Sequence, residues 1–193
     1  DDDIEDILIR VDSKKLRSIS RKELINLFVN SYNILKESGT FIWGINMVSN
    51  PFMMSDKINT NLGIIPAGFY GFINRHKMKN KIRNDAREDV ERSIMYFKED
   101  GLIVRYMNIT FKTIMRDISG GIQAVLGKNN RVRKEMEYVD KLEKKYSDYC
   151  CIRKKGGVGI SLRRKKSEKK MEGLNILMKL TKKKIKNSLK KNI

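Results

Sequence analysis

A helix that stops at a glycine and passes at once into an apolar strand constrains this chain more than any other feature. The pattern lies between residues 87 and 106. Its apolar positions return at spacings of four and three: Val90, Ile94 and Phe97. Gly101 suits the left-handed conformation that ends helices, and residues 102–106 have the composition of a strand. This predicts one helix face in the core. The charged positions elsewhere on the wheel are expected in solvent: Glu91, Arg92 and Lys98.

Two carboxylates, Glu88 and Asp89, stand in the first turn of this helix. Asp85 or Asn84 can supply its N-cap, and the partial positive charge at a helix beginning favours acidic residues there. Capping is therefore one interpretation of the pair. The other is chemical, with one carboxylate acting as a general base or as a stabiliser of charge.

A second acidic cluster, Asp1 to Asp3, favours the chemical interpretation. Mn²⁺ and Mg²⁺ prefer carboxylate oxygens, and a short acidic run can hold one such ion while leaving coordination positions for a diphosphate. The two clusters allow a division of labour. Asp1 to Asp3 would bind the metal, and Glu88 or Asp89 would act on the substrate.

Aromatic residues and glycines alternate in two further segments. The buried-type strand 41–46 contains the single tryptophan, Trp43, whose ring either packs in the core or stacks on a sugar. Residues 64–75 form either a twisted strand or a loop whose amides approach a ligand closely. The candidate ligand-binding residues of the second segment are Gly68, Phe69, Tyr70 and Gly71.

These motifs, in this order, resemble a glycosyltransferase of the GT-A type. The resemblance is carried by Asp-Asp-Asp, a glycine-rich aromatic loop, Glu-Asp opening a helix, and Asp-Gly before a Val-Arg-Tyr strand, and it spans residues 1–121. It points to the family associated with TET/JBP-type DNA base dioxygenases in phages and other genomes. The fold it implies is α/β, a GT-A-like (Rossmann-like) mixed sheet flanked by helices.

The resemblance also implies roles for the residues. The donor would be a nucleoside diphosphate sugar, with Asp1 and Asp3 holding Mn²⁺ or Mg²⁺ against its diphosphate. Asp89 would take the proton from the acceptor hydroxyl, with Glu88 positioning it; in a retaining enzyme Asp89 would instead stabilise the transition state. The acceptor would be a hydroxylated base in DNA. Because the family places a nucleotide-binding half before its aspartate motif, an upstream polypeptide is expected to complete the enzyme.

The net charge of +19 on 193 residues predicts attraction to a polyanion, of which nucleic acid is the first choice. From residue 163 onward, 13 lysines and arginines stand against two glutamates, an excess of 11 positive charges. We therefore expect two parts: a catalytic, acceptor-side region over residues 1–150, and a basic ribbon with a helical tail over 151–193. The candidate nucleic-acid contacts are Lys79, Lys81, Arg83, Arg153, Lys154, Lys155, Arg163, Arg164, Lys165 and Lys166.

Two further helices are predicted. One begins at the capping box of Ser20 and Glu23 and ends at Gly39; its expected core residues are Leu24, Leu27, Phe28, Ile34 and Leu35. The other is expected to cover the sheet, with an apolar face made of Val132, Met136, Val139, Leu142 and Tyr146.

Several functions stay open besides sugar transfer. The chain could be a nucleic-acid-binding protein without catalysis, or a metal-dependent nuclease or nucleotidyltransferase, since clustered carboxylates also serve phosphoryl transfer. The adjacent cysteines Cys150 and Cys151 are expected to be reduced thiols, and no apolar run is long enough to span a bilayer. The expected location is the cytoplasm, that of the host for a phage or viral protein, or the nucleus.

Overall fold

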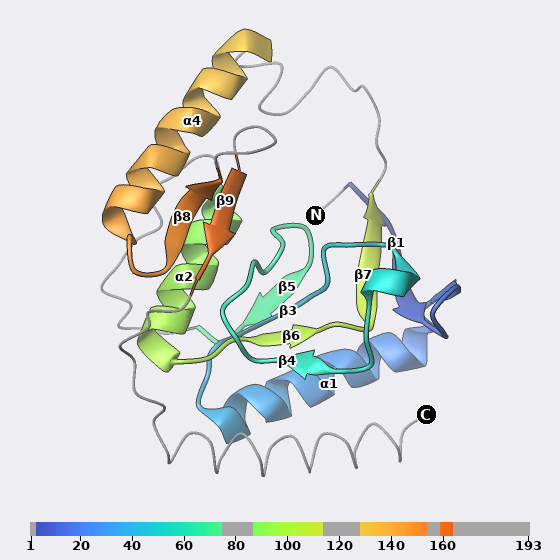
Figure 1. Cartoon of the computed structure of the whole chain (residues 1–193). Coiled ribbons are helices and arrows are strands. Elements are labelled where there is room, and N and C mark those ends of the chain that lie inside the picture. The colour runs from blue at the N-terminus through green and yellow to red at the C-terminus, as the bar shows by residue number, and fades with distance from the viewer. Residues whose placement is uncertain (1–2, 75–86, 114–127, 154–158, 164–193) are drawn as a thin grey trace.

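The protein is a mixed α/β structure made of helices and several small sheets (Figure 1). The computed structural model describes residues 3–74, 87–113, 128–153 and 159–163. Within these ranges lie the helices α1 (Arg21–Ser38), α2 (Glu88–Asp100) and α4 (Lys128–Lys145), and a short 3-10 helix (Pro51–Met53). The strands are β1 (Ile4–Arg10), β2 (Leu16–Ser18), β3 (Ile42–Ile45), β4 (Ile58–Asn59), β5 (Tyr70–Phe72), β6 (Val104–Tyr106), β7 (Ile109–Thr113), β8 (Cys150–Arg153) and β9 (Gly159–Leu162).

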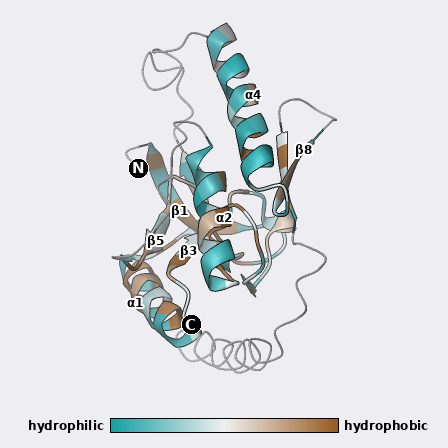
Figure 2. Cartoon of the chain, turned by 90° about the vertical axis from the view of Figure 1, so that its left-hand side faces the viewer, coloured by the Kyte–Doolittle hydropathy of each residue, from teal (hydrophilic) through white to brown (hydrophobic). Residues whose placement is uncertain are grey.

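The central sheet has the strand order β4-β6-β3-β5. Strands β3 and β6 are parallel, and the chain between them includes α2; β4 and β5 are antiparallel edge strands. Side chains alternate between the two faces of the sheet. Trp43 and Val104 point toward α1, whereas Ile42 and Ile103 pack against α2. The sheet is therefore covered by one helix on each face, as Figures 1 and 2 show.

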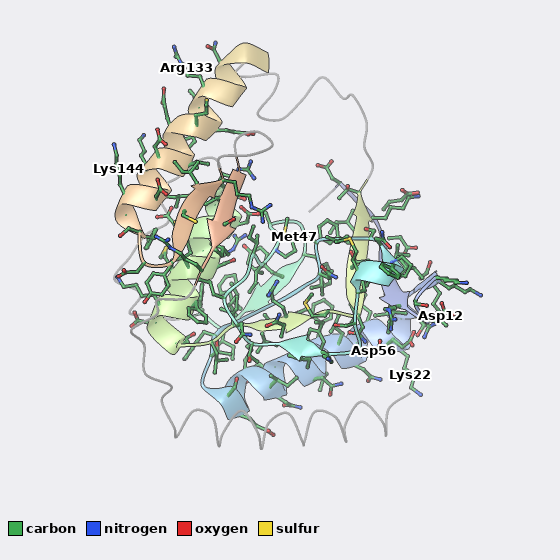
Figure 3. The ribbon with its side chains drawn as sticks, viewed as in Figure 1. Asp12, Lys22, Met47, Asp56, Arg133 and Lys144 are labelled. Atoms are coloured by element: carbon green, nitrogen blue, oxygen red, sulfur yellow. The ribbon has the colours of Figure 1, made fainter. Side chains whose placement is uncertain are left out.

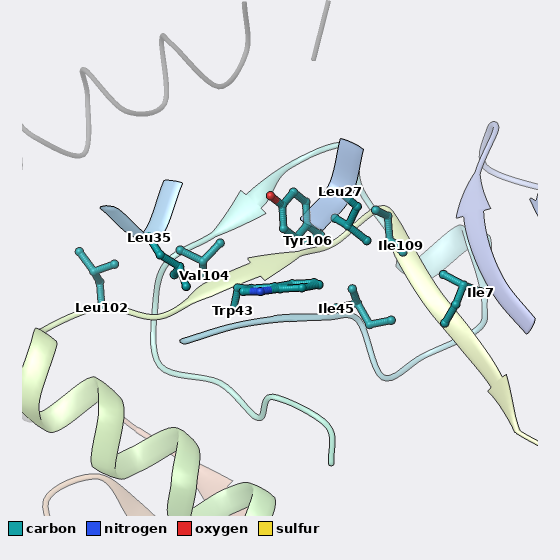
Figure 4. Close-up of a cluster of buried hydrophobic side chains, with 9 residues drawn as sticks. All are labelled: Ile7, Leu27, Leu35, Trp43, Ile45, Leu102, Val104, Tyr106 and Ile109. Atoms are coloured by element: carbon teal, nitrogen blue, oxygen red, sulfur yellow. The ribbon is translucent and has the colours of Figure 1, made fainter. Parts of the chain in front are cut away.

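Helix α1 has the boundaries that the sequence predicts. The Ser20 hydroxyl accepts a hydrogen bond from the Glu23 N–H, the Glu23 carboxylate accepts one from the Ser20 N–H, and Gly39 ends the helix in the left-handed region at φ 70°. Leu27 and Leu35 are buried beneath it (Figure 4). The prediction for Phe28 was wrong, because this ring lies at the margin of the core and stays half-exposed.

A second sheet, in the order β2-β1-β7, adjoins the central one. The backbone N–H of Asn46, just after β3, donates to the carbonyl of Ile109 in β7 at 2.8 Å. This bond joins the two sheets, and Ile7 of β1 packs in the same apolar cluster as Trp43 and Tyr106 (Figure 4). The two sheets consequently share one core.

Helix α4 and the β8–β9 hairpin form a layer over α2. Val139, Leu142 and Tyr146 are buried, and the last two pack with Val90 and Ile94 of α2. The helix was predicted to cover the sheet, but it covers α2, and Met136 is half-exposed where a core position was expected. The outer side of α4 is polar, with Arg133 and Lys144 pointing away from the body (Figures 2 and 3).

This extra layer also overturns the prediction for two charged residues of α2. Glu91 and Arg92 were expected in solvent, but both are buried, and only Lys98 is exposed as expected. The physical reason is that α2 is enclosed by the sheet on one side and by α4 with its hairpin on the other. A single amphipathic stripe is typical of a helix with one covered face, whereas α2 has two covered faces.

Candidate functional site

The candidate site is built around the beginning of α2. The helix opens after Arg87, which takes the left-handed conformation at φ 62° and makes no side-chain cap. The predicted caps, Asp85 and Asn84, lie outside the described residues. Glu88 and Asp89 are half-buried, and one Asp89 carboxylate oxygen accepts the Val90 N–H at 2.8 Å. The Glu88 carboxylate has no hydrogen-bond or ion-pair partner within the described ranges.

A chain of hydrogen bonds fixes the first turn of α2 to the loop before β5. The Ile65 N–H donates to the Ser93 hydroxyl at 2.8 Å, and that hydroxyl donates to the Asp89 carbonyl at 2.7 Å. Ile65 itself fills the space above Gly44 of β3, where an added Cβ would lie 2.5 Å from an Ile65 methyl group. Glycine at this position lets the loop lie close to the sheet, which orients the Glu88-Asp89 turn.

Arg92 lies one turn further along α2 and contacts Tyr70 of β5. Its Nη1 donates to the Tyr70 hydroxyl oxygen at 3.0 Å, and its guanidinium carbon lies 3.9 Å from the centre of the Tyr70 ring. Arg92 is only 8% exposed, and its Nε and Nη2 are buried with no hydrogen-bond partner among the residues that the structure describes. Burying donors of a cation without acceptors is costly, so this guanidinium is well suited to an added anion.

Next to Arg92, Glu91 points to the other side of α2, toward α4. Its carboxylate accepts hydrogen bonds from the Lys145 ammonium at 2.7 Å and the Tyr146 hydroxyl at 3.3 Å. The hydrogen bond that Lys145 donates to Glu91 raises the pKa of Lys145, and burial raises the pKa of Tyr146. This buried pair joins α2 to α4, so we assign it a structural role.

Arg105 of β6 is a second arginine on the α2-facing side of the sheet. It pairs in register with Gly44, which in turn pairs with Tyr70 of β5. Its guanidinium lies against the backbone of Gly63, its Nε is buried without a partner, and burial lowers its pKa. Two incompletely satisfied guanidinium groups thus lie on one face of the sheet.

Trp43, by contrast, lies in the core. It is 4% exposed, and its ring makes edge contacts with Phe28, Phe69 and Tyr106 at centroid distances of 5.8 to 5.9 Å. Gly71 provides room for this indole, since an added Cβ would lie 2.3 Å from its Nε1. These positions fit the packing interpretation of both residues.

The other candidate residues of segment 64–75 also lie either in the core or at the beginning of α2. Phe69 packs against Trp43, and Gly68 lies beside the Phe111 ring. Tyr70 is different because its side chain is on the opposite face of the sheet, in contact with Arg92. Of the four candidate residues in this segment, Tyr70 is therefore the one that the structure brings to the α2 site.

The described residues do not by themselves make a metal site. Asp1 lies outside them, and Asp3 is an exposed carboxylate just before β1. No group of three His, Cys, Asp or Glu side chains in these ranges could hold an ion. A single exposed carboxylate does not meet the coordination needs of Mn²⁺ or Mg²⁺, so no chemical step is derived through a metal here.

Two of the predicted nucleic-acid contacts belong to the hairpin. Arg153 donates to the Ser161 hydroxyl at 2.7 Å, and Arg163 donates to the Ser147 carbonyl at 2.7 Å. Both side chains are exposed. The other predicted contacts lie outside the described residues: Lys79, Lys81, Arg83, Lys154, Lys155, Arg164, Lys165 and Lys166.

The burial of Arg92 was not predicted, although the sequence contains a signal for it. Four apolar residues stand in succession on α2, from Ile94 to Phe97, so they point around most of the helix circumference. A helix that is apolar on more than one side is covered on more than one side. A charged residue on such a helix is expected to be buried and to need a partner.

No helix among the described residues is both long and apolar enough to cross a membrane. Comparison of the chain with protein-family models, with curated proteins and with solved structures finds no match.

Proposed function

We propose that this chain is the acceptor-side part of a metal-dependent glycosyltransferase, which moves a sugar from a nucleoside diphosphate sugar to a hydroxylated base in DNA. The observation that carries the proposal is the Glu88-Asp89 pair. It is half-buried at the beginning of a helix that is otherwise enclosed, and backbone hydrogen bonds through Ser93 fix its turn. The mixed sheet, with parallel β3 and β6 and a helix on each face, agrees with a GT-A-like fold.

The chemistry assigned to the pair is proton transfer. The acceptor hydroxyl oxygen attacks the anomeric carbon, the bond from that carbon to the diphosphate breaks, and the hydroxyl proton passes to Asp89. Glu88, whose carboxylate has no partner among the described residues, orients the hydroxyl.

The test is a donor-release assay. The longest form of the protein is incubated with Mn²⁺ and a panel of nucleotide sugars, with and without hydroxymethylated DNA, and free nucleoside diphosphate is measured. We expect release from one donor that rises with modified DNA and falls about 100- to 10,000-fold in Asp89→Asn. Asp140→Asn removes an exposed carboxylate of α4 and serves as the matched control.

Two outcomes would reject the proposal, and each of them would indicate a different function. Salt-sensitive DNA binding without release from any donor would indicate a binding protein, which the charge of +19 favours as the second candidate. DNA cleavage that requires Asp3 and Asp89 would indicate a metal-dependent nuclease. In the first case Glu88 and Asp89 would serve the helix dipole alone.

A further inference from the structure

We propose that Phe72, Tyr70 and Arg92 form a contact site for an unpaired stretch of a DNA strand. In this site a base stacks on Phe72. A neighbouring phosphate accepts a hydrogen bond from the Tyr70 hydroxyl group and lies close to the positively charged Arg92 guanidinium. The inference rests on the proposed function, since such a strand would be the acceptor. An enzyme that modifies a base acts on single-stranded DNA or takes the base out of the duplex, so an unpaired stretch of strand can be its substrate.

Phe72 provides the stacking surface. It is 54% exposed at the end of β5, an edge strand of the central sheet (Figure 1). Its ring is nearly parallel to that of Tyr70, at an interplanar angle of 19° and a centroid distance of 6.1 Å. Parallel rings at a sheet edge are the type of platform on which unpaired bases stack in single-strand-binding proteins.

Tyr70 provides a donor with a fixed direction. Because Arg92 donates to the Tyr70 oxygen, the hydroxyl proton must be donated to another group. The described residues offer no acceptor for it. A phosphate oxygen would fill this role, and a hydrogen bond of ordinary length would bring it within about 6 Å of the guanidinium.

Arg92 provides positive charge that the described part of the chain does not compensate. Its Nε and Nη2 have no partner there, and the adjacent Glu91 is already held by Lys145 and Tyr146. A phosphate at Tyr70 would offset the buried positive charge without displacing another contact. Arg92 acts in part through Tyr70, and so it is a positioning residue for that hydroxyl.

The location connects this contact to the proposed chemistry. Arg92 is four residues after Glu88, on the same side of α2 and about 6 Å along the helix axis. Along the chain, Phe72 is followed closely by a run of cations: Arg75, Lys77, Lys79, Lys81 and Arg83. A strand held at Phe72 and Tyr70 would therefore pass near the carboxylates proposed to act on its hydroxylated base.

The test measures binding of a labelled single-stranded oligonucleotide by fluorescence anisotropy over a series of salt concentrations. Phe72→Ala should weaken binding about 5- to 100-fold, the range for losing one stacked base, and Phe72→Trp should restore it. The control is Phe52→Ala, which removes an aromatic ring that is 82% exposed on the 3-10 helix. Fluorescence of Trp43, the single tryptophan of the wild-type chain, checks that Phe72→Ala and Phe52→Ala fold, and circular dichroism of the helices checks Phe72→Trp, which contains a second indole.

The other two residues have distinct expected signatures. Tyr70→Phe should weaken binding without changing its salt dependence, because the hydroxyl carries no charge. Arg92→Gln should lower the slope of log affinity against log salt by about 0.7, the value for one phosphate contact on a single strand. A merely structural role for Arg92 would lower stability and leave that slope unchanged.

Three results would overturn the inference. The first is a Phe72→Ala protein that binds as well as Phe52→Ala does. The second is competition by free nucleoside diphosphate at the same site, which would assign the phosphate to a nucleotide instead of a strand. The third is tighter binding of RNA with the same Phe72 dependence.

The donor-release assay separates this inference from the proposed function. Sugar transfer that is unaffected by Phe72→Ala would leave the transferase proposal standing and reject the strand contact. Phe72-dependent DNA binding without transfer from any donor would support the strand contact and reject the transferase.

Discussion

The ion pair of Glu91 and Lys145 should be a main stabiliser of the contact between α2 and α4. Glu91 is fully buried, and its carboxylate lies 2.7 Å from the Lys145 ammonium, whose side chain is 43% exposed. Lys145→Met keeps the length and apolar character of the side chain but leaves the buried carboxylate without its cation. Removing one partner of a fully buried pair costs about 3 to 5 kcal/mol.

The expected cost here is smaller than that range. The ammonium keeps part of its hydration, and Tyr146 still donates a hydrogen bond to the carboxylate. We therefore expect Lys145→Met to lower the free energy of unfolding by about 2 kcal/mol. For a chain of this size this lowers the melting temperature by about 4 to 8 °C.

The pH dependence follows from the direction of the lysine shift. The hydrogen bond to Glu91 raises the pKa of Lys145 in the folded state. Stability from such a group is fully present below the unfolded pKa, about 10.4, and is lost as the pH rises through the folded pKa. The difference in stability between wild type and Lys145→Met should therefore shrink above about pH 10.4.

The assay is urea unfolding at pH 7 and at alkaline pH, followed by Trp43 fluorescence for the sheet and by circular dichroism for the helices. Lys144→Met is the matched control, because Lys144 is an exposed neighbour that points away from the body (Figure 3). We expect it to change stability by less than about 0.5 kcal/mol. Equal stability of the two variants at pH 7 would refute the reasoning.

Three further predictions concern packing, thiol reactivity and acid stability. Gly71→Ala should cost about 1 to 3 kcal/mol and change the fluorescence of Trp43, because the added methyl would overlap its indole. A thiol reagent should label Cys151 in the folded protein and both cysteines after unfolding, because Cys150 is buried and burial raises the pKa of its thiol to about 11. Equal labelling rates of Cys150 and Cys151 in the folded protein would contradict this. Hydrogen bonding, above all from the Arg17 side chain, lowers the pKa of Glu23 to about 2. The stability that this carboxylate contributes is present above about pH 4.3 and is lost as the pH falls toward 2, so Glu23→Gln should remove it. Thermal melting of wild type and Glu23→Gln at pH 6 and pH 3 measures the difference.

Local signals predicted the helix boundaries well. The capping box at Ser20, Gly39 and Gly101 act within a few residues of themselves, so their effect can be read from the sequence without knowing the fold. Composition placed a basic ribbon from residue 151 onward, and the hairpin of β8 and β9 begins at Cys150. The start of α2 was harder, because Arg87 takes an uncommon left-handed conformation that no sequence rule assigns to arginine.

The partners of Glu91, the exposure of Met136 and the position of α4 could not be predicted in the same way. Each depends on which element covers which, and a helical wheel reports only the spacing of apolar residues along one element. Glu91 is buried because Lys145 and Tyr146, more than fifty residues away, meet its carboxylate. Such long-range pairing leaves no periodic pattern in the sequence.

Glu91 and Arg92 together explain how one helix can serve both stability and binding. Adjacent residues on a helix point about 100° apart, so Glu91 faces α4 while Arg92 faces β5. If the two side chains shared a face, they would pair with each other and Arg92 would have no charge to offer. Because Lys145 satisfies Glu91 on the far side, two nitrogens of the Arg92 guanidinium, beside Tyr70, have no partner within the described ranges. Replacing Lys145 should therefore affect stability first and strand binding only through the orientation of α2.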